Sequence, residues 1–141
     1  KEFDTNIWIR PEISGKIAQF GDLNELVKLS QDFDQVLPCI DFSHLFARTV
    51  GKNNTYEEFN SILEQVEKIG KDAIKNMHIH VSGIEYGDRG EKHHLILEES
   101  KFNYKDLMKS LKEFKVAGCL TCESPNIEED AKLMQKYYES L

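Results

Sequence analysis

The most constraining feature of this sequence is a pattern that occurs four times in succession: a short apolar run followed by a capped amphipathic segment. The apolar runs cover residues 6–12, 36–41, 77–81 and 116–123. Parallel neighbouring strands cannot be joined by a tight turn and need a helical crossover, which this alternation supplies. The sequence therefore predicts an α/β fold in which parallel strands alternate with helices.

Capping residues mark where the four helices are expected to begin. The predicted starts are Asp22, Thr55, Asn103 and Pro125, each followed by apolar residues at helical spacing. Thr55 and Glu58 form the sequence pattern of a capping box, in which two side chains bond the free N–H groups of the first turn. Between the third run and the third helix, residues 82–102 are expected to form a long polar loop.

Composition limits the classes of protein that fit. With 141 residues, 40% of them hydrophobic, the chain has enough apolar material for one domain. No apolar run approaches the ~20 residues of a membrane span, and three cysteines are too few for a disulfide scaffold, so we expect a cytoplasmic protein that binds no membrane. The net charge of −7 argues against electrostatic binding to nucleic acid unless bound dications reverse the charge locally.

Side chains that commonly ligate metals follow the ends of the predicted strands. Glu12, Asp41, His78 and Glu123 lie at or near the four strand ends, with His44, Glu91 and His93 in the loops that follow. The carboxyl ends of parallel strands meet at one edge of the sheet, where α/β proteins place their functional residues. Imidazole and carboxylate ligands suit Zn²⁺, Mn²⁺ or Fe²⁺, so the pattern predicts a metal centre at this edge.

Four segments make the pattern specific: CIDFSHLF (39–46), MHIH (77–80), YGDRGEKHH (86–94) and LTCESPN (120–126). In type, order and interval they resemble the C-terminal half of the endonuclease IV family of apurinic/apyrimidinic endonucleases. These are zinc-dependent (β/α)₈, or TIM, barrels of the xylose-isomerase-like group. The resemblance implies that residues 1–141 form a single domain equivalent to the C-terminal half of such a barrel, with the N-terminal half absent from this chain.

The resemblance also implies a role for each candidate residue. Glu12 would bridge two metals, Asp41, His78 and Glu123 would complete one site, and His44, Glu91 and His93 would hold another ion. Glu12 and Glu123 would be catalytic, with up to three Zn²⁺ in the complete barrel and Mn²⁺ as an alternative. Apart from the resemblance, Arg89 and Lys92 flank proposed ligands in the sequence and are candidates for contact with DNA phosphate. The family usually has Asp where this chain has Glu91.

The activity implied for the complete barrel is cleavage of duplex DNA on the 5′ side of abasic sites, and the half alone is expected to be nearly inactive. The missing half, a second copy or a partner chain would have to close the barrel. Two other functions stay open: a sugar isomerase or epimerase of the same group, and a truncated module that binds metal without turnover.

The remaining histidines and cysteines have less specific interpretations. His80 shares a strand face with His78 and is expected to support a ligand or to lie in the barrel interior. His94 is expected to face away from the metals. Cys119 and Cys122 are predicted to be buried thiols, because residues three apart on a strand point to opposite faces.

Overall fold

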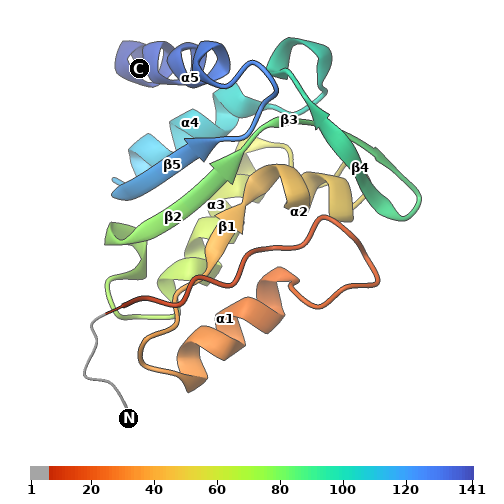
Figure 1. Cartoon of the computed structure of the whole chain (residues 1–141). Coiled ribbons are helices and arrows are strands. Elements are labelled where there is room, and N and C mark those ends of the chain that lie inside the picture. The colour runs from red at the N-terminus through yellow and green to blue at the C-terminus, as the bar shows by residue number, and fades with distance from the viewer. Residues whose placement is uncertain (1–6) are drawn as a thin grey trace.

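The structure is a computed structural model that describes residues 7–141, and its centre is a parallel sheet of three strands. The strands are β1 (Cys39–Asp41), β2 (Met77–Val81) and β5 (Gly118–Cys122), in the order β1-β2-β5 (Figure 1). The run predicted as the first strand forms only isolated parallel bridges, Ile9 with Val36 and Glu12 with Cys39. Asn6, the first residue of that prediction, lies outside the described residues.

Five α-helices and two short 3₁₀ helices are present in the described part of the chain. They are α1 (Leu23–Asp32), α2 (Phe42–Arg48), α3 (Tyr56–Glu67), η1 (Ala73–Lys75), η2 (Leu97–Glu99), α4 (Tyr104–Glu113) and α5 (Glu128–Ser140). The predicted caps of α1, α3 and α4 are confirmed, because the side chains of Asp22, Thr55 and Asn103 each accept the backbone N–H three residues on. The last helix begins at Glu128, three residues after the predicted start at Pro125.

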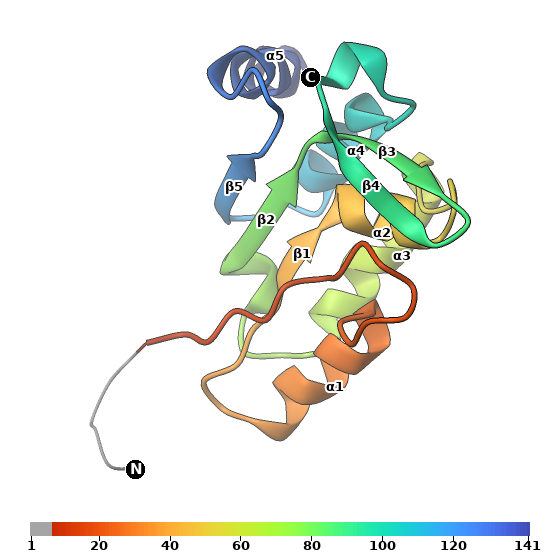
Figure 2. The same ribbon diagram turned by 45° about the vertical axis from the view of Figure 1, so that its right-hand side comes forward.

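The hydrophobic core lies between one face of the sheet and the helices behind it (Figures 1 and 2). Strand β2 alternates strictly, with Met77, Ile79 and Val81 buried and the two histidines between them half-buried. Three phenylalanines from α2 and α3 and from the segment before α4 pack edge to face at 5.8–5.9 Å between ring centroids: Phe42, Phe59 and Phe102. The apolar face is thus covered by helices, and the histidine face is left for the site.

Residues 82–102 are not the predicted polar loop but contain an antiparallel hairpin of β3 (Gly83–Gly87) and β4 (Gly90–Leu95). Gly90 has a positive φ of 93°, and a Cβ there would lie 2.2 Å from the carbonyl oxygen of Gly15. The N–H of Glu91 donates to that same oxygen at 2.9 Å. Only glycine permits this close approach, which fixes the hairpin against the loop after Glu12.

Strand β5 pairs with β2 on one side, and its residues are the most exposed of the sheet. The prediction of buried thiols is therefore wrong for Cys119, which is exposed, while Cys122 is half-buried. Exposure follows from the position of β5 at the end of the strand order, where no strand among residues 7–141 pairs with its outer side. None of the helices described is long and apolar enough to cross a lipid bilayer.

Candidate metal centre

Four side chains converge at the carboxyl edge of the sheet: Glu12, Asp41, His80 and Glu123, here called the carboxylate group. Their ligand atoms all lie within 4.8 Å of one another. Nδ1 of His80 is 3.3 Å from Oε1 of Glu12 and 3.3 Å from Oε1 of Glu123. Four separate segments supply these residues, so the group exists only in the folded chain.

Strand register explains the convergence. Asp41 pairs with His80 across β1 and β2, and His80 pairs with Thr121 across β2 and β5. Glu123 follows β5 directly and donates its backbone N–H to the carbonyl of Val81 at 2.9 Å. Parallel pairing in register places residues at the ends of adjacent strands at one level.

The environment of Asp41 indicates that the carboxylate group fits a cation. Asp41 is 1% exposed, and its Oδ1 accepts the backbone N–H of His44 at 2.7 Å. Its buried Oδ2 has no hydrogen-bond partner among the described residues. Nδ1 of His44 lies 3.2 Å from Oδ2 of Asp41. In the tautomer with a proton on Nδ1, that N–H donates to the carbonyl of Ile13 at 2.9 Å and is not available to Asp41.

The electrostatics of Asp41 lead to the same conclusion. Burial raises the pKa of Asp41 to about 8; the N–H of His44 opposes this rise, and the carboxylates of Glu12 and Glu123 add to it. Ionised carboxylates this close to one another are costly in a buried setting. A dication would offset the repulsion and give the free oxygen a partner, so the donor set fits a metal ion.

A second set, here called the hairpin group, consists of His44, Glu91 and His94, whose ligand atoms also lie within 4.8 Å of one another. Nε2 of His44 is 3.6 Å from Oε2 of Glu91. Nδ1 of His44 lies 2.9 Å from the carbonyl of Ile13, and Nδ1 of His94 lies 3.0 Å from that of Glu123. Such bonds orient an imidazole and leave Nε2 for a metal. A Cβ at Gly15 would lie 2.5 Å from Glu91 Oε2, so glycine keeps this space open.

Of the seven predicted ligands, five lie in these two groups, and His78 and His93 lie outside them. Glu12, Asp41 and Glu123 lie together, as do His44 and Glu91. The carboxylate group contains His80 rather than the predicted His78, because His80 is level with Asp41 and His78 is level with Cys39.

The hairpin group contains His94 rather than the predicted His93. Tyr86 pairs with Glu91 but Glu85 pairs with His93, so Lys92 is an extra residue that forms a β-bulge. The bulge puts Glu91 and His94 on the same face. His93 is 59% exposed on the other face, with Nε2 3.3 Å from Oε2 of Glu85.

The two predicted phosphate-contacting residues lie on the same hairpin. Arg89 is exposed at its tip, between β3 and β4. Lys92 is also exposed, and its Nζ donates to Oε1 of Glu85 at 3.0 Å. Both residues flank Glu91 in the sequence, but Lys92 would have to leave Glu85 to reach another anion.

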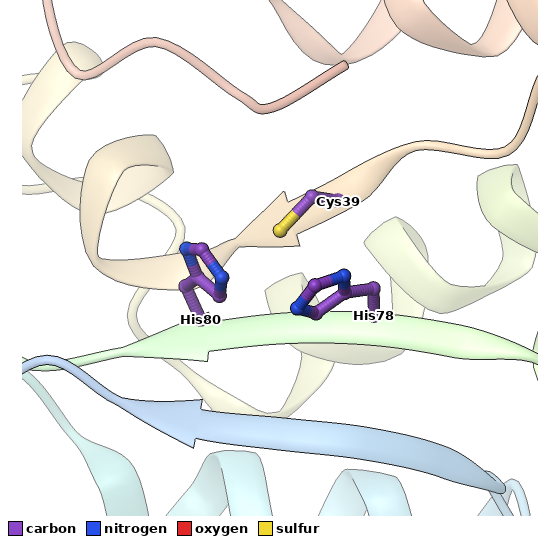
Figure 3. A group of neighbouring side chains, drawn as sticks. All are labelled: Cys39, His78 and His80. Carbon is purple, nitrogen blue, oxygen red and sulfur yellow. The ribbon is translucent and has the colours of Figure 1, made fainter. Parts of the chain in front are cut away.

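A third set of ligand-type side chains lies on the histidine face of the sheet: Cys39, His78 and His80, here called the thiol group (Figure 3). Burial raises the pKa of the Cys39 thiol well above its usual range, and the carboxylates of Glu12, Asp41 and Glu123 raise it further. Burial and the neighbouring His80 lower the pKa of His78. The group therefore contains a protonated thiol and, at neutral pH, an uncharged His78 imidazole.

Parallel strands, crossover helices and ligand-type side chains at the carboxyl edge are the architecture of (β/α) barrel proteins. The chain belongs to the family described as Xylose isomerase-like TIM barrel, which it matches over residues 3–141. The predicted α/β fold, with parallel units forming half of a TIM barrel, agrees with this membership.

The chain is also similar to individual proteins. An uncharacterized protein of Methanocaldococcus jannaschii is 54% identical over 137 residues, which are 96% of this chain and 50% of that protein. The crystal structure of AsfvAP:AG matches with a TM-score of 0.64 at 14% identity, over 94% of this chain and 50% of that one. This second likeness concerns the fold alone. The chain spans about half the length of each.

Proposed function

We propose that this chain is the C-terminal half of a metal-dependent DNA repair endonuclease of the endonuclease IV type. As part of the complete barrel it cleaves the phosphodiester bond on the 5′ side of an abasic site in duplex DNA. The observation that carries the proposal is the pair of adjacent ligand sets, the carboxylate group and the hairpin group. They are joined by the single helical turn from Asp41 to His44.

The chemistry explains why two neighbouring sets matter. Bound dications neutralise the anionic oxygens of a phosphodiester, lower the pKa of water and stabilise the leaving oxygen. In this chain Glu12, Asp41, His80 and Glu123 would hold one ion. His44, Glu91 and His94 would hold another. Zinc is favoured by the mixture of imidazole and carboxylate donors, with Mn²⁺ as an alternative and up to three ions in the complete barrel.

Two carboxylates have further roles in this proposal. Glu12 has two oxygens, and its side chain is 40% exposed, so one oxygen is available to an ion held by another part of the barrel. Glu123 lies beside His80 and orients the attacking water while it ligates. Arg89, exposed at the hairpin tip, is the stronger candidate for a phosphate contact because Lys92 is paired with Glu85.

A sugar isomerase or epimerase is the alternative that the family membership supports. The carboxylate group by itself provides enough ligands for one ion and a proton-transferring carboxylate. The hairpin group favours the nuclease, because a further ion has no role in simple epimerisation. In either case a further segment, a second copy or a partner chain must complete the barrel, and the exposed outer side of β5 is where it would join.

The decisive experiment uses a labelled duplex with one abasic site and the complete protein that contains this chain. We expect incision 5′ to the lesion, lost on chelation and restored by Zn²⁺ or Mn²⁺. Asp41→Asn and His80→Asn should each lower the rate by orders of magnitude, because ligands of one centre act as a unit. Glu98→Gln, an exposed acidic residue of η2, is the matched control and should cleave normally.

The residues 1–141 alone should cleave poorly or not at all. If the abasic strand stayed intact and the protein isomerised a sugar, the nuclease proposal would be wrong and the isomerase would be the function. Metal binding with neither activity would favour the remaining alternative, a non-catalytic module that binds metal.

A further inference from the structure

The thiol group combines donors that the carboxylate and hairpin groups lack. Cys39 comes from β1, and His78 and His80 come from β2, with Cys39 directly paired to His78 in the parallel register. Figure 3 shows the sulfur and both imidazole rings in the space between the two strands. One ligand atom from each of the three residues lies within 4.8 Å of the others. One ion could therefore reach all three with small side-chain movements.

We propose that Cys39, His78 and His80 form a separate zinc site, ligated by Sγ and by one nitrogen of each imidazole. Zn²⁺ forms short bonds to thiolate and imidazole and accepts three protein ligands with a fourth position open. Mixed sulfur and nitrogen donors select zinc over Mg²⁺ or Mn²⁺, which prefer oxygen. This site shares His80 with the carboxylate group but, unlike that group, contains no oxygen ligand.

The orientation of His80 supports the assignment. Its Nδ1 lies 3.3 Å from carboxylate oxygens of both Glu12 and Glu123. The opposite ring nitrogen, Nε2, is on the side where Cys39 and His78 lie (Figure 3). With the proton on Nδ1, the ring donates to a carboxylate and presents Nε2 to the ion, which is the usual carboxylate–histidine–zinc arrangement.

Binding has a definite proton balance. Zn²⁺ displaces the proton of the Cys39 thiol, a zinc–sulfur bond forms, and the proton leaves to solvent. The imidazoles of His78 and His80 bind as neutral ligands. A neutral His80 has one unprotonated nitrogen, so it ligates an ion in the thiol group or in the carboxylate group, but not in both at once. Occupation of the thiol group therefore competes with the carboxylate group for His80.

Cobalt gives a direct test, because a thiolate bound to Co²⁺ produces an intense near-ultraviolet absorption band that oxygen and nitrogen ligands do not. We expect the purified protein, titrated with Co²⁺, to show this band, and Zn²⁺ to abolish it by displacement. Cys39→Ser should remove the band while Co²⁺ still binds elsewhere. His78→Ala should weaken the Co²⁺ affinity read from the band at least tenfold.

Two control variants identify the ligands. Cys119→Ser removes the exposed thiol that is level with His78 on the neighbouring strand, and the band should persist. Glu91→Gln alters only the hairpin group, so its band should be normal even if it weakens DNA cleavage. Circular dichroism establishes that each variant is folded, and His78→Ala carries the test if Cys39→Ser is not. A protein that binds Co²⁺ without the band, or a band that Cys119→Ser removes, would overturn the site.

Discussion

Replacing Ser43 by alanine should destabilise the chain by about 2–5 kcal/mol although it deletes a single non-hydrogen atom. Ser43 is 0% exposed, and its hydroxyl donates to the carbonyl of Ser82 at 2.7 Å while accepting the N–H of Ser82 at 2.8 Å. Alanine leaves a buried donor and a buried acceptor unpaired, at about 1–3 kcal/mol each, against a gain of roughly 0.5 kcal/mol in helix propensity. The bonds link α2, which begins after Asp41, to the end of β2, which supplies His80.

Urea denaturation followed by circular dichroism measures this loss as a lower midpoint at an unchanged slope. The matched control is Ser61→Ala on α3, where the serine is exposed and the free energy of unfolding should change by less than about 0.5 kcal/mol. Zinc affinity should fall in Ser43→Ala as Asp41 and His80 lose their alignment. A loss for Ser43→Ala no larger than that for Ser61→Ala would refute the argument.

Two further substitutions test other supports of the site. Gly90→Ala combines a positive φ with a clash against Gly15, so it should lower the free energy of unfolding by about 1–3 kcal/mol and weaken metal binding at the hairpin group. The control is Gly70→Ala, which has a positive φ of 75° but open space around it. It isolates the energetic cost of the positive φ and should leave metal binding, measured by calorimetry, normal. Asp130 is buried and accepts from the N–H of Leu97 and from Asn126, so Asp130→Ala should lower the free energy of thermal unfolding by about 2–4 kcal/mol. Asp130→Asn keeps an acceptor and should lose less.

Features set by neighbouring residues could be predicted from the sequence. The caps of α1, α3 and α4 depend on one side chain and a backbone group three residues away, so Asp22, Thr55 and Asn103 were sufficient. Helix α2 was not predicted, because five of its seven residues are buried and the sequence shows no polar stripe. The hairpin was not predicted, because β4 carries polar residues on both faces and shows no alternation.

Which of two neighbouring histidines lies in each group could not be predicted from the sequence. Whether His78 or His80 lies level with Asp41 depends on the pairing of β1 with β2, which spacing along one strand does not determine. Whether His93 or His94 faces His44 depends on the bulge at Lys92. Strand-end position indicates which segments contribute, and strand pairing decides which residue of each segment lies in a group.

The two carboxylate oxygens of Asp41 have different partners, and this restricts which residues can replace Asp41 in other members of the family. Oδ1 caps α2 by accepting the N–H of His44, and the unpartnered Oδ2 belongs to the carboxylate group. A longer glutamate would lose the cap geometry, and an asparagine would lose the charge, so we expect position 41 to be invariant among relatives. Glu91 lies on β4 and caps none of the described helices, so exchange between Asp and Glu should be tolerated there.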